Sequence, residues 1–549
     1  MSVMPKLTQR WWSVFILPLF FVSLGCIFLP YAGLQNDEVL FATPDYHQPS
    51  SSLFTIPVGR YHVPVMQLSY LGALKTWLYA PLLFRIRPSY LLIRLPALLL
   101  GAMTTGMLFW FLRKIHGPRA AWAGGVLLVT DTMFLLTTCF DWGPVVLQHF
   151  LMMAGLVLLV QFAASGNRSA LFWGFVALGL GMWDKALFSW MLSGLLVATV
   201  LVFSRELWSR LTGANLARAA AGFCLGALPL LVYNASSGMA TFRSNTSFTL
   251  SEMPLKIKVL RTTWDGSALL AYFAYSSYSS TPGQPREPDD AVERVSAGLH
   301  NWFGERGRNA LDAGTIAAIL FFIPLLWRRR ARRILLFCLI AAGVAWVQMA
   351  VTRNAGGSAH HVVLLYPLPQ CFLAVAFAEA SELALLRRWN LGAWLLGAVV
   401  FLLAGANLLL TNQYLYQFAR YGAAGTWSTA IFRLSDETKR FQGVELVVDD
   451  WGILNPLVVL HRGRLPLVYV ESSFLEPGEN EKQQAWEQGL LASDIWIGHT
   501  KEFREFPATA EKIETSAAAL GLHKQIVELV ADRNNRPVYE IFRFVRGPS

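Results

Sequence analysis

Eleven apolar stretches restrict the fold of this sequence more than any other feature. The hydrocarbon core of a bilayer is about 30 Å thick, so a helix needs about 20 apolar residues to cross it. The stretches lie at residues 12–30, 89–112, 119–137, 144–163, 170–184, 186–203, 217–233, 312–327, 334–351, 362–380 and 391–412. Only 15% of the 549 residues are charged, whereas soluble domains carry about 25%. The sequence therefore predicts an α-helical polytopic membrane protein with about eleven transmembrane helices.

Lysine and arginine predict the side that each loop faces, because short cytoplasmic loops are enriched in them. If the N-terminus is cytoplasmic, the cytoplasmic segments hold sixteen of these residues, five of them between positions 328 and 333. The short outer loops hold only Lys185 and Arg353. Membrane topology therefore explains the net charge of +11, and we expect no nucleic acid as a partner.

Two long outer segments separate some of the apolar stretches. The first, residues 31–88, includes 65–84, in which apolar and aromatic residues are mixed with Lys75. This mixture predicts helices that lie in the membrane interface, with Trp77 at headgroup depth. The second, residues 234–311, contains a stretch rich in proline, glycine and aspartate (TPGQPREPDD), which predicts a long loop.

From residue 413 the composition becomes that of a soluble domain. GVELVVDDWG, LPLVYVES, SDIWIGHT and PVYEIFRFV predict short strands, and EKQQAWEQGLLA and TAEKIETSAAALG predict helices between them. This alternation predicts a small extracytoplasmic α/β domain over residues 413–549, after a membrane domain over residues 1–412. It contains no cysteine, so we expect no disulfide framework there. Short loops and an outer α/β domain favour a bacterial inner membrane, and an endoplasmic reticulum location stays open.

Three acidic residues on the predicted outer face are candidates for catalysis. Asp37 and Glu38 lie a few residues beyond the first apolar stretch. A poorly solvated carboxylate binds a proton more tightly, which suits a general base, although the pair could also cap a short helix. Asp141 lies in the turn between the third and fourth stretches, where it is either catalytic or a helix cap. Asp131, inside the third stretch, is expected to be a buried and partnered structural residue.

Cations gather on the same predicted face, where they could bind a phosphate group. The candidates are Lys185, which follows Asp184, together with Arg60, His62, Arg94, Arg353, His360 and His361. Adjacent histidines on a helix point about 100° apart, which does not suit a shared metal ion. A divalent ion held by Asp37, Glu38 and Asp141 stays open. Carboxylates that face cations predict transfer of a group from a phosphate-containing lipid.

Five segments of the sequence resemble, in order and spacing, those of the membrane glycosyltransferases of the GT-C fold. The segments are QNDEVLF (35–41), RLPALLLGAMTTG (94–106), FDWGPVVLQHFLMM (140–153), GLGMWDKALFSWML (179–192) and HHVVLLYPLP (360–369). Within that fold, the chain is similar to the protein O-mannosyltransferases and to the bacterial lipid A aminoarabinose transferases. The resemblance covers roughly residues 10–415.

The resemblance implies an inverting transfer of a sugar from a polyprenyl-phosphate donor, at the extracytoplasmic face, to a protein, lipid or glycan acceptor. It implies that Asp37 is the base or orients the acceptor, that Glu38 supports it, and that Lys185 and Arg94 lie near the lipid phosphate. Some relatives carry Lys-Pro in the first outer loop, where this chain has Val63-Pro64.

Arg60 or His62 would replace the missing lysine. Ala186 stands where the family usually has glycine.

Two other functions remain alternatives to the transferase. A transporter or flippase of a lipid-linked sugar usually has polar residues near the midplane and repeated halves, and neither is visible here. A non-catalytic scaffold that presents the C-terminal domain would not explain why Asp37, Asp141 and Lys185 share one face.

Overall fold

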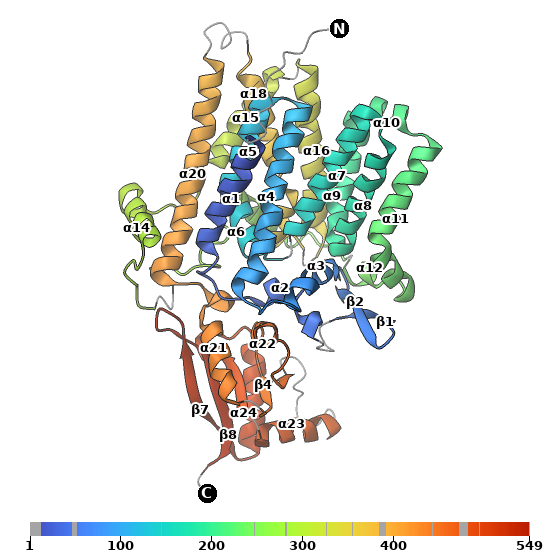
Figure 1. Ribbon diagram of the computed structural model, residues 1–549. Coiled ribbons are helices and arrows are strands. Elements are labelled where there is room, and N and C mark those ends of the chain that lie inside the picture. Colours follow the sequence, from blue (N-terminus) through green and yellow to red (C-terminus); the bar gives the residue numbers. More distant parts are fainter. Residues whose placement is uncertain are drawn as a thin grey trace.

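The computed structural model describes most of the chain between residues 13 and 547. The gaps in this range are residues 47–51, 144, 246, 280–282, 326, 354, 384–390, 442, 471–480 and 494. A long helical bundle forms one part of the molecule, and a sheet domain lies at one end of it (Figure 1).

Each of the eleven apolar stretches contains helix. The bundle helices are α1 (Ser13–Phe28), α4 (Tyr90–Ile115), α5 (Pro118–Thr130), α6 (Thr132–Cys139), α7 (Val146–Ser165), α8 (Arg168–Asp184), α9 (Ser189–Val202), α11 (Gly213–Ser236), α15 (Leu311–Leu325), α16 (Arg329–Val351), α18 (Leu368–Ala380) and α20 (Gly392–Tyr421). Among the described residues, five helices are long and apolar enough to cross a membrane, or up to eight if each bent pair counts as one span. The chain is a polytopic, mostly helical membrane protein, and the number of spans and their orientation stay predictions.

Asp131 explains why the third apolar stretch is bent. It separates α5 from α6, which meet at 56°. Its Oδ1 accepts a hydrogen bond from the Phe134 backbone N–H at 2.9 Å, and its Oδ2 accepts one from Gln370 Nε2 at 3.1 Å. Asp131 is therefore the N-cap of α6 and is buried and partnered, as predicted.

The arginine-rich turns meet at the end of the bundle remote from the sheet domain (Figure 1). Arg330 Nε donates to the Ile115 carbonyl at the end of α4, at 3.0 Å. Arg333 Nη1 donates to Glu206 in α10 (Ser204–Arg210), at 2.7 Å. These contacts join turns that are distant in sequence at one end of the bundle. The predicted topology requires such clustering, because it places these turns on the same side of the membrane.

The other end of the bundle carries an irregular layer between the helices and the sheet domain (Figure 1). It contains α2 (Asn36–Val39), η1 (Thr43–Tyr46), β1 (Phe54–Val58), β2 (Tyr61–Leu68), β3 (Leu71–Gly72), α3 (Leu74–Leu83), α12 (Ala240–Asn245) and α13 (Met253–Trp264). By contrast, α14 (Ala291–Phe303) lies at the flank of the bundle, beside α20 (Figure 1). The expected interfacial helices over 65–84 are only partly present. α3 is one of them, but the preceding residues belong to a hairpin, because β2 pairs with both β1 and β3.

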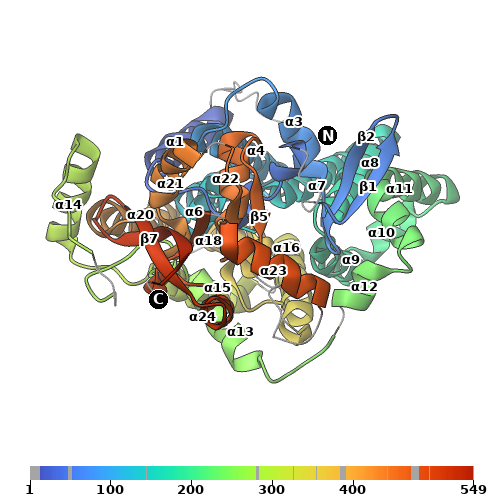
Figure 2. The same cartoon turned by 90° about the horizontal axis from the view of Figure 1, so that it is seen from below.

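The C-terminal domain is a five-stranded sheet with helices packed against it (Figure 2). Its elements are α21 (Ala430–Thr438), β4 (Leu446–Val448), α22 (Leu454–His461), β5 (Leu467–Tyr469), α23 (Glu481–Ser493), β6 (Ile495–His499), α24 (Pro507–Ala519), β7 (Leu522–Ala531) and β8 (Pro537–Arg546). The strand order is β5-β4-β6-β8-β7, with β5, β4 and β6 parallel. The predicted strands and helices are confirmed, whereas β7, α21 and α22 were not expected. α20 continues to Tyr421, past the predicted boundary at residue 413.

The sheet domain packs directly on the segment that carries Asp37. Val459 of α22 is fully buried in one apolar cluster with Leu34 and Val39. The Gly33 backbone N–H donates to the Trp427 carbonyl at 2.6 Å. A Cβ at Gly33 would lie 2.0 Å from a backbone oxygen, so only glycine allows this approach. The outer loop and the C-terminal domain therefore share a core.

Candidate active site

Glu38 is a buried structural carboxylate. Both its oxygens accept from Arg94: Nε to Oε1 at 2.5 Å and Nη2 to Oε2 at 2.9 Å, with both side chains fully buried. Oε2 also accepts from the Gln35 backbone N–H at 3.3 Å and completes the capping box of α2. Glu38 therefore has its oxygens occupied and is shielded from any substrate.

Arg94 is correspondingly unsuited to the role that the sequence predicts for it. Besides Glu38, it donates through Nη1 to the carbonyls of Leu29 and Ala32, at 2.6 and 2.8 Å, and through Nη2 to that of Gly33, at 2.7 Å. All three guanidinium nitrogens are thus occupied by the chain itself. Arg94 ties the end of α1 to α2 and holds the acidic loop in place, an arrangement that does not favour the predicted contact with phosphate.

Asp37 differs from its neighbour because it is partly exposed. Burial raises the pKa of Asp37, and hydrogen bonds from the Asn36 amide and the Trp142 indole, together with the charge of Lys185, act in the opposite direction. Two neutral donors and one cation therefore lie close to the Asp37 carboxylate, which stays partly exposed. The acidic pair therefore divides into a structural Glu38 and an accessible Asp37.

Lys185 lies at the end of α8, close to Asp37. Its Nζ donates to the Gly143 carbonyl at 2.7 Å. Burial lowers the pKa of Lys185 to about 8, and the neighbouring carboxylates, Asp184, Asp37 and Asp141, oppose this effect. Lys185 is thus a mostly protonated cation near neutral pH, and an incoming anion would stabilise its charge further.

Lys75 and Asp141 form a second buried ion pair beside Lys185. Lys75 Nζ donates to Asp141 Oδ2, and the two side chains are almost completely buried. Lys75 Nζ also lies 4.5 Å from the centre of the Phe41 ring, within range of a cation–π contact. Asp141 has a φ of +41°, a conformation that costs a residue other than glycine about 1–3 kcal/mol. The surrounding packing therefore holds the turn with Asp141 in a strained form.

His360 joins the site by packing on Trp142. The two ring centres are 4.4 Å apart, and His361 follows with its ring centre 4.3 Å from that of His360. A Cβ at Gly143, which has a φ of +69°, would lie within 2.5 Å of the His360 ring. Glycine at this position is therefore needed to bring α17 (Ala359–Val362) against the turn that carries Trp142.

The remaining predicted cations lie outside this cluster. Arg60 and His62 are exposed on the β1–β2 hairpin, and the Arg60 guanidinium donates to the Tyr61 hydroxyl at 2.9 Å. Arg353 is also exposed, and its backbone N–H donates to the Ser247 carbonyl at 2.8 Å. Within the described ranges, no contact joins these three side chains to Asp37 or Lys185.

Asp37, Glu38 and Asp141 do not come together as a three-ligand group among the residues that the structure describes. In the part of the chain that the structure describes, no three His, Cys, Asp or Glu side chains come together in a way that could hold an ion. Of the three residues considered from the sequence, Glu38 and Asp141 each pair with a buried cation, and Asp37 stands apart from them.

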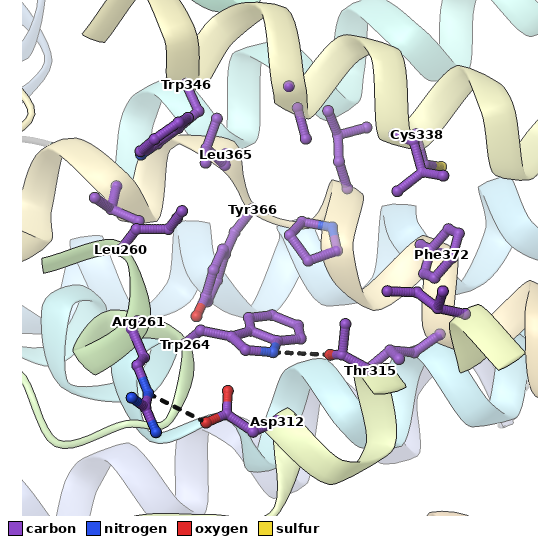
Figure 3. Close-up of a pocket in the computed structure, with 18 of the residues that line it drawn as sticks. Leu260, Arg261, Trp264, Asp312, Thr315, Cys338, Trp346, Leu365, Tyr366 and Phe372 are labelled. Carbon is purple, nitrogen blue, oxygen red and sulfur yellow. Dashed lines mark hydrogen bonds and ion pairs between the residues drawn. The ribbon is translucent and has the colours of Figure 1, made fainter. Parts of the chain in front are cut away.

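An apolar cavity of about 480 Å³ opens near the histidines, between α13, α15, α16 and α18 (Figure 3). Leu260, Trp346, Leu365 and Phe372 are among its lining side chains. On one side, Trp264 Nε1 donates to Thr315 at 2.8 Å, and Arg261 faces Asp312 at 3.8 Å. Val362 also lines the cavity and directly follows His361 in the chain.

Two residues of this site, Asn36 and Lys75, were not expected from the sequence. Lys75 offers a usable signal, since it is an isolated cation within an apolar and aromatic segment. Asn36 and Trp142 directly precede and follow carboxylates that the sequence does single out. The approach of Trp142 to Asp37 depends on tertiary contacts, which neighbouring positions in the sequence do not reveal.

Solved structures share this fold over most of their length. ArnT from Cupriavidus metallidurans, bound to undecaprenyl phosphate, is 15% identical with a TM-score of 0.56, over 97% of this chain and 98% of that chain. The apo oligosaccharyltransferase from Archaeoglobus fulgidus is 12% identical with a TM-score of 0.50, over 89% and 70% respectively. No protein-family model and no curated protein sequence matches the chain. At these identities the likeness shows the fold alone, and it is the GT-C fold that the sequence motifs predict.

Proposed function

We propose that this chain is an inverting glycosyltransferase. It transfers a sugar from a polyprenyl-phosphate carrier to a protein, lipid or glycan acceptor, at the face of the membrane that carries the C-terminal domain. Its place is the bacterial inner membrane, with that domain outside. The fold shared with a structure that holds undecaprenyl phosphate supports the donor class.

The observation that carries this proposal is the contrast between Asp37 and the charges around it. Asp37 is a partly exposed carboxylate near the Asn36 and Trp142 donors, whereas Glu38 is paired and buried. Lys185 lies close enough to Asp37 to influence its pKa. An accessible base beside a buried cation suits a reaction in which a proton is removed and a phosphate departs.

The chemistry follows from these positions. The Asp37 carboxylate takes the proton from an acceptor hydroxyl or amine while that oxygen or nitrogen forms a bond to the anomeric carbon. The bond between the anomeric carbon and the phosphate oxygen breaks, and its electrons leave with the polyprenyl phosphate. Lys185 stabilises the charge that develops on this leaving group. Attack on the side opposite to the phosphate inverts the anomeric configuration.

The Lys75–Asp141 pair supports the same reaction through its effect on Lys185. A buried pair is costly to break, so it keeps Asp141 from competing with the donor for Lys185. The Asp141 carboxylate in turn favours the protonated form of Lys185. His360 and His361 lie next to this group and offer ring nitrogens for phosphate oxygens.

The apolar cavity is our proposed site for the isoprenoid chain of the donor. Its walls are mainly hydrocarbon and aromatic, and Val362 connects it to the histidine pair. An isoprenoid chain there would bury apolar area, which contributes about 0.8 kcal/mol for each buried CH₂ group.

Replacing Gly343 by leucine tests the cavity. Gly343 lines it, and an added Cβ would meet open space, so the new side chain fills the cavity without a clash. We expect KM for the lipid donor to rise about tenfold, because a few buried CH₂ groups are displaced, while kcat stays near wild type. Gly397→Leu in α20 is the matched control, since its Cβ also meets open space away from the cavity. Equal KM values for both variants would remove the cavity from donor binding.

Lipid mass spectrometry on cells that lack this protein tests the function itself. We expect a polyprenyl-phosphate sugar to accumulate in the deletion strain and to disappear when the full-length gene is restored. That lipid is then incubated with the purified full-length protein and envelope extract in detergent micelles. We expect release of polyprenyl phosphate. A transporter cannot produce it, because transport breaks no bond and a micelle has no separate compartments. An unchanged lipid pool, or a lipid that accumulates but stays intact in micelles, would overturn the proposal.

A further inference from the structure

Asn455, in the first turn of α22 of the C-terminal domain, contacts the loop that carries Asp37, the proposed base. Its Nδ2 donates to Asn36 Oδ1 at 2.8 Å. The Asn36 amide lies next to the Asp37 carboxylate and acts on its pKa in the direction of a donor. Two amides thus connect the sheet domain to the proposed base, across 419 positions of sequence.

The turn before α22 is built to hold Asn455 in place. Asp450, just after β4, pairs with His499 Nδ1 at 2.7 Å, at the end of the neighbouring strand β6. The same carboxylate accepts from the backbone N–H groups of Trp451, Glu505 and Phe506, at 2.9, 3.0 and 3.1 Å. This nearly buried carboxylate fixes the carboxyl ends of two parallel strands and therefore the start of α22.

The packing of α22 adds a second constraint. Asn455 and Val459 are four positions apart, so they lie on the same face of the helix. Val459 is fully buried against Val39, in the helix that also carries Asn36 and Asp37. At the other end of α22, a Cβ at Gly463 would come within 2.7 Å of a backbone oxygen of Tyr46. The helix is therefore closely packed against the loop along its length.

We propose that Asn455 is a positioning residue for Asp37, acting through the Asn36 amide, so that the C-terminal domain completes the active site. This inference rests on the proposed function, because it assigns a role toward the proposed base. It goes further by giving the C-terminal domain a part in the chemistry.

The hydrogen bond from Asn455 sets the orientation of the Asn36 side chain. Because Asn455 Nδ2 donates to Asn36 Oδ1, the Asn36 NH₂ group is the end that faces Asp37. Without Asn455, Asn36 can turn over and present its oxygen to the carboxylate, which repels it. A fixed donor keeps Asp37 ionised and oriented, and chained hydrogen bonds polarise each other.

Replacing Asn455 by leucine, which has a similar size and no donor, tests the role. We expect kcat to fall about tenfold, the size expected for one lost hydrogen bond to a reacting group, while KM for the donor stays unchanged. The acid limb of the pH profile of kcat/KM should move to higher pH, because Asp37 loses a donor to its ionised form. The other charged or titratable groups that face Asp37 are Lys185, Tyr70 and Tyr272, and Glu505 faces Tyr272 from the sheet domain.

A double-mutant cycle with Asn36→Ala separates positioning from folding. If Asn455 acts through Asn36, then Asn455→Leu has no further effect on kcat or on the pH profile in the Asn36→Ala background. Asn455→Ala repeats the test if the leucine variant does not fold. Asn534→Ala is the matched control: its amide also bonds the membrane domain, at the Gln284 and Arg420 carbonyls, but remote from Asp37. It should leave the pH profile unchanged.

The outcomes distinguish this inference from the proposed function. If wild type transfers sugar and both Asn455 variants keep its kcat and pH profile, the positioning role is wrong and the function stands. The same holds if Asn455→Leu and Asn36→Ala add independently. If wild type transfers no sugar in micelles, the proposed function itself fails, and the inference fails with it.

Discussion

Replacing Asp37 by asparagine is expected to lower kcat for sugar transfer by about 10²- to 10⁴-fold, the usual contribution of a general base. Asparagine keeps the size of the side chain and an oxygen for the Asn36 and Trp142 donors, but it cannot take a proton from the acceptor. KM for the donor should stay near wild type, because the phosphate is assigned to Lys185. Initial rates of the purified full-length protein over a donor series would separate the two constants.

Asp45→Asn is the control for this variant. Asp45 lies in η1, in the same loop, and is buried. Burial raises the pKa of Asp45 to about 7, so a neutral amide resembles its protonated form and should be tolerated. We therefore expect Asp45→Asn to keep the wild-type rate. If Asp37→Asn kept it as well, Asp37 would not be the base, and the search for one would move to the other carboxylates near Lys185.

The helices could be predicted because crossing a bilayer demands a long apolar run, which is a local property of the sequence. The strands and helices of the C-terminal domain were likewise visible in short alternating patterns. The hairpin of β1 and β2 was not. Its second strand, YHVPVMQL, contains Pro64 and lies in an apolar segment that also suits a helix, so periodicity could not separate the two.

The active site was predictable only where a residue's place along the chain decides its role. Asp37 lies a few residues beyond the first apolar stretch, and this position, with the family motif and the charges around it, made it a candidate whose role stays a prediction. The pairing of Glu38 with Arg94 joins residues 56 positions apart, and that of Lys75 with Asp141 joins residues 66 apart. Such pairs depend on how the helices pack, so the sequence could identify charged residues near one face but not their partners.

Replacing Arg94 by methionine is expected to destabilise the protein by about 3–5 kcal/mol, the range found when one partner of a buried ion pair is removed. Glu38 would stay buried without a cation, and the carbonyls of Leu29, Ala32 and Gly33 would lose their donor. Thermal unfolding of the detergent-purified protein, followed by tryptophan fluorescence, measures the effect. A second change, Glu38→Leu, should recover part of the loss, because it removes the uncompensated charge.

Arg119→Met provides the comparison that separates a structural arginine from a ligand-binding one. Arg119 faces Glu382 at 3.5 Å, with the two side chains 42% and 54% exposed, and an exposed pair contributes only about 0–1 kcal/mol. We expect Arg94→Met to melt well below Arg119→Met. If Arg94 instead bound the donor phosphate, the two variants would be equally stable and only Arg94→Met would raise KM for the donor. The fully occupied guanidinium predicts the first result, since a cation with no free N–H has none to offer a phosphate.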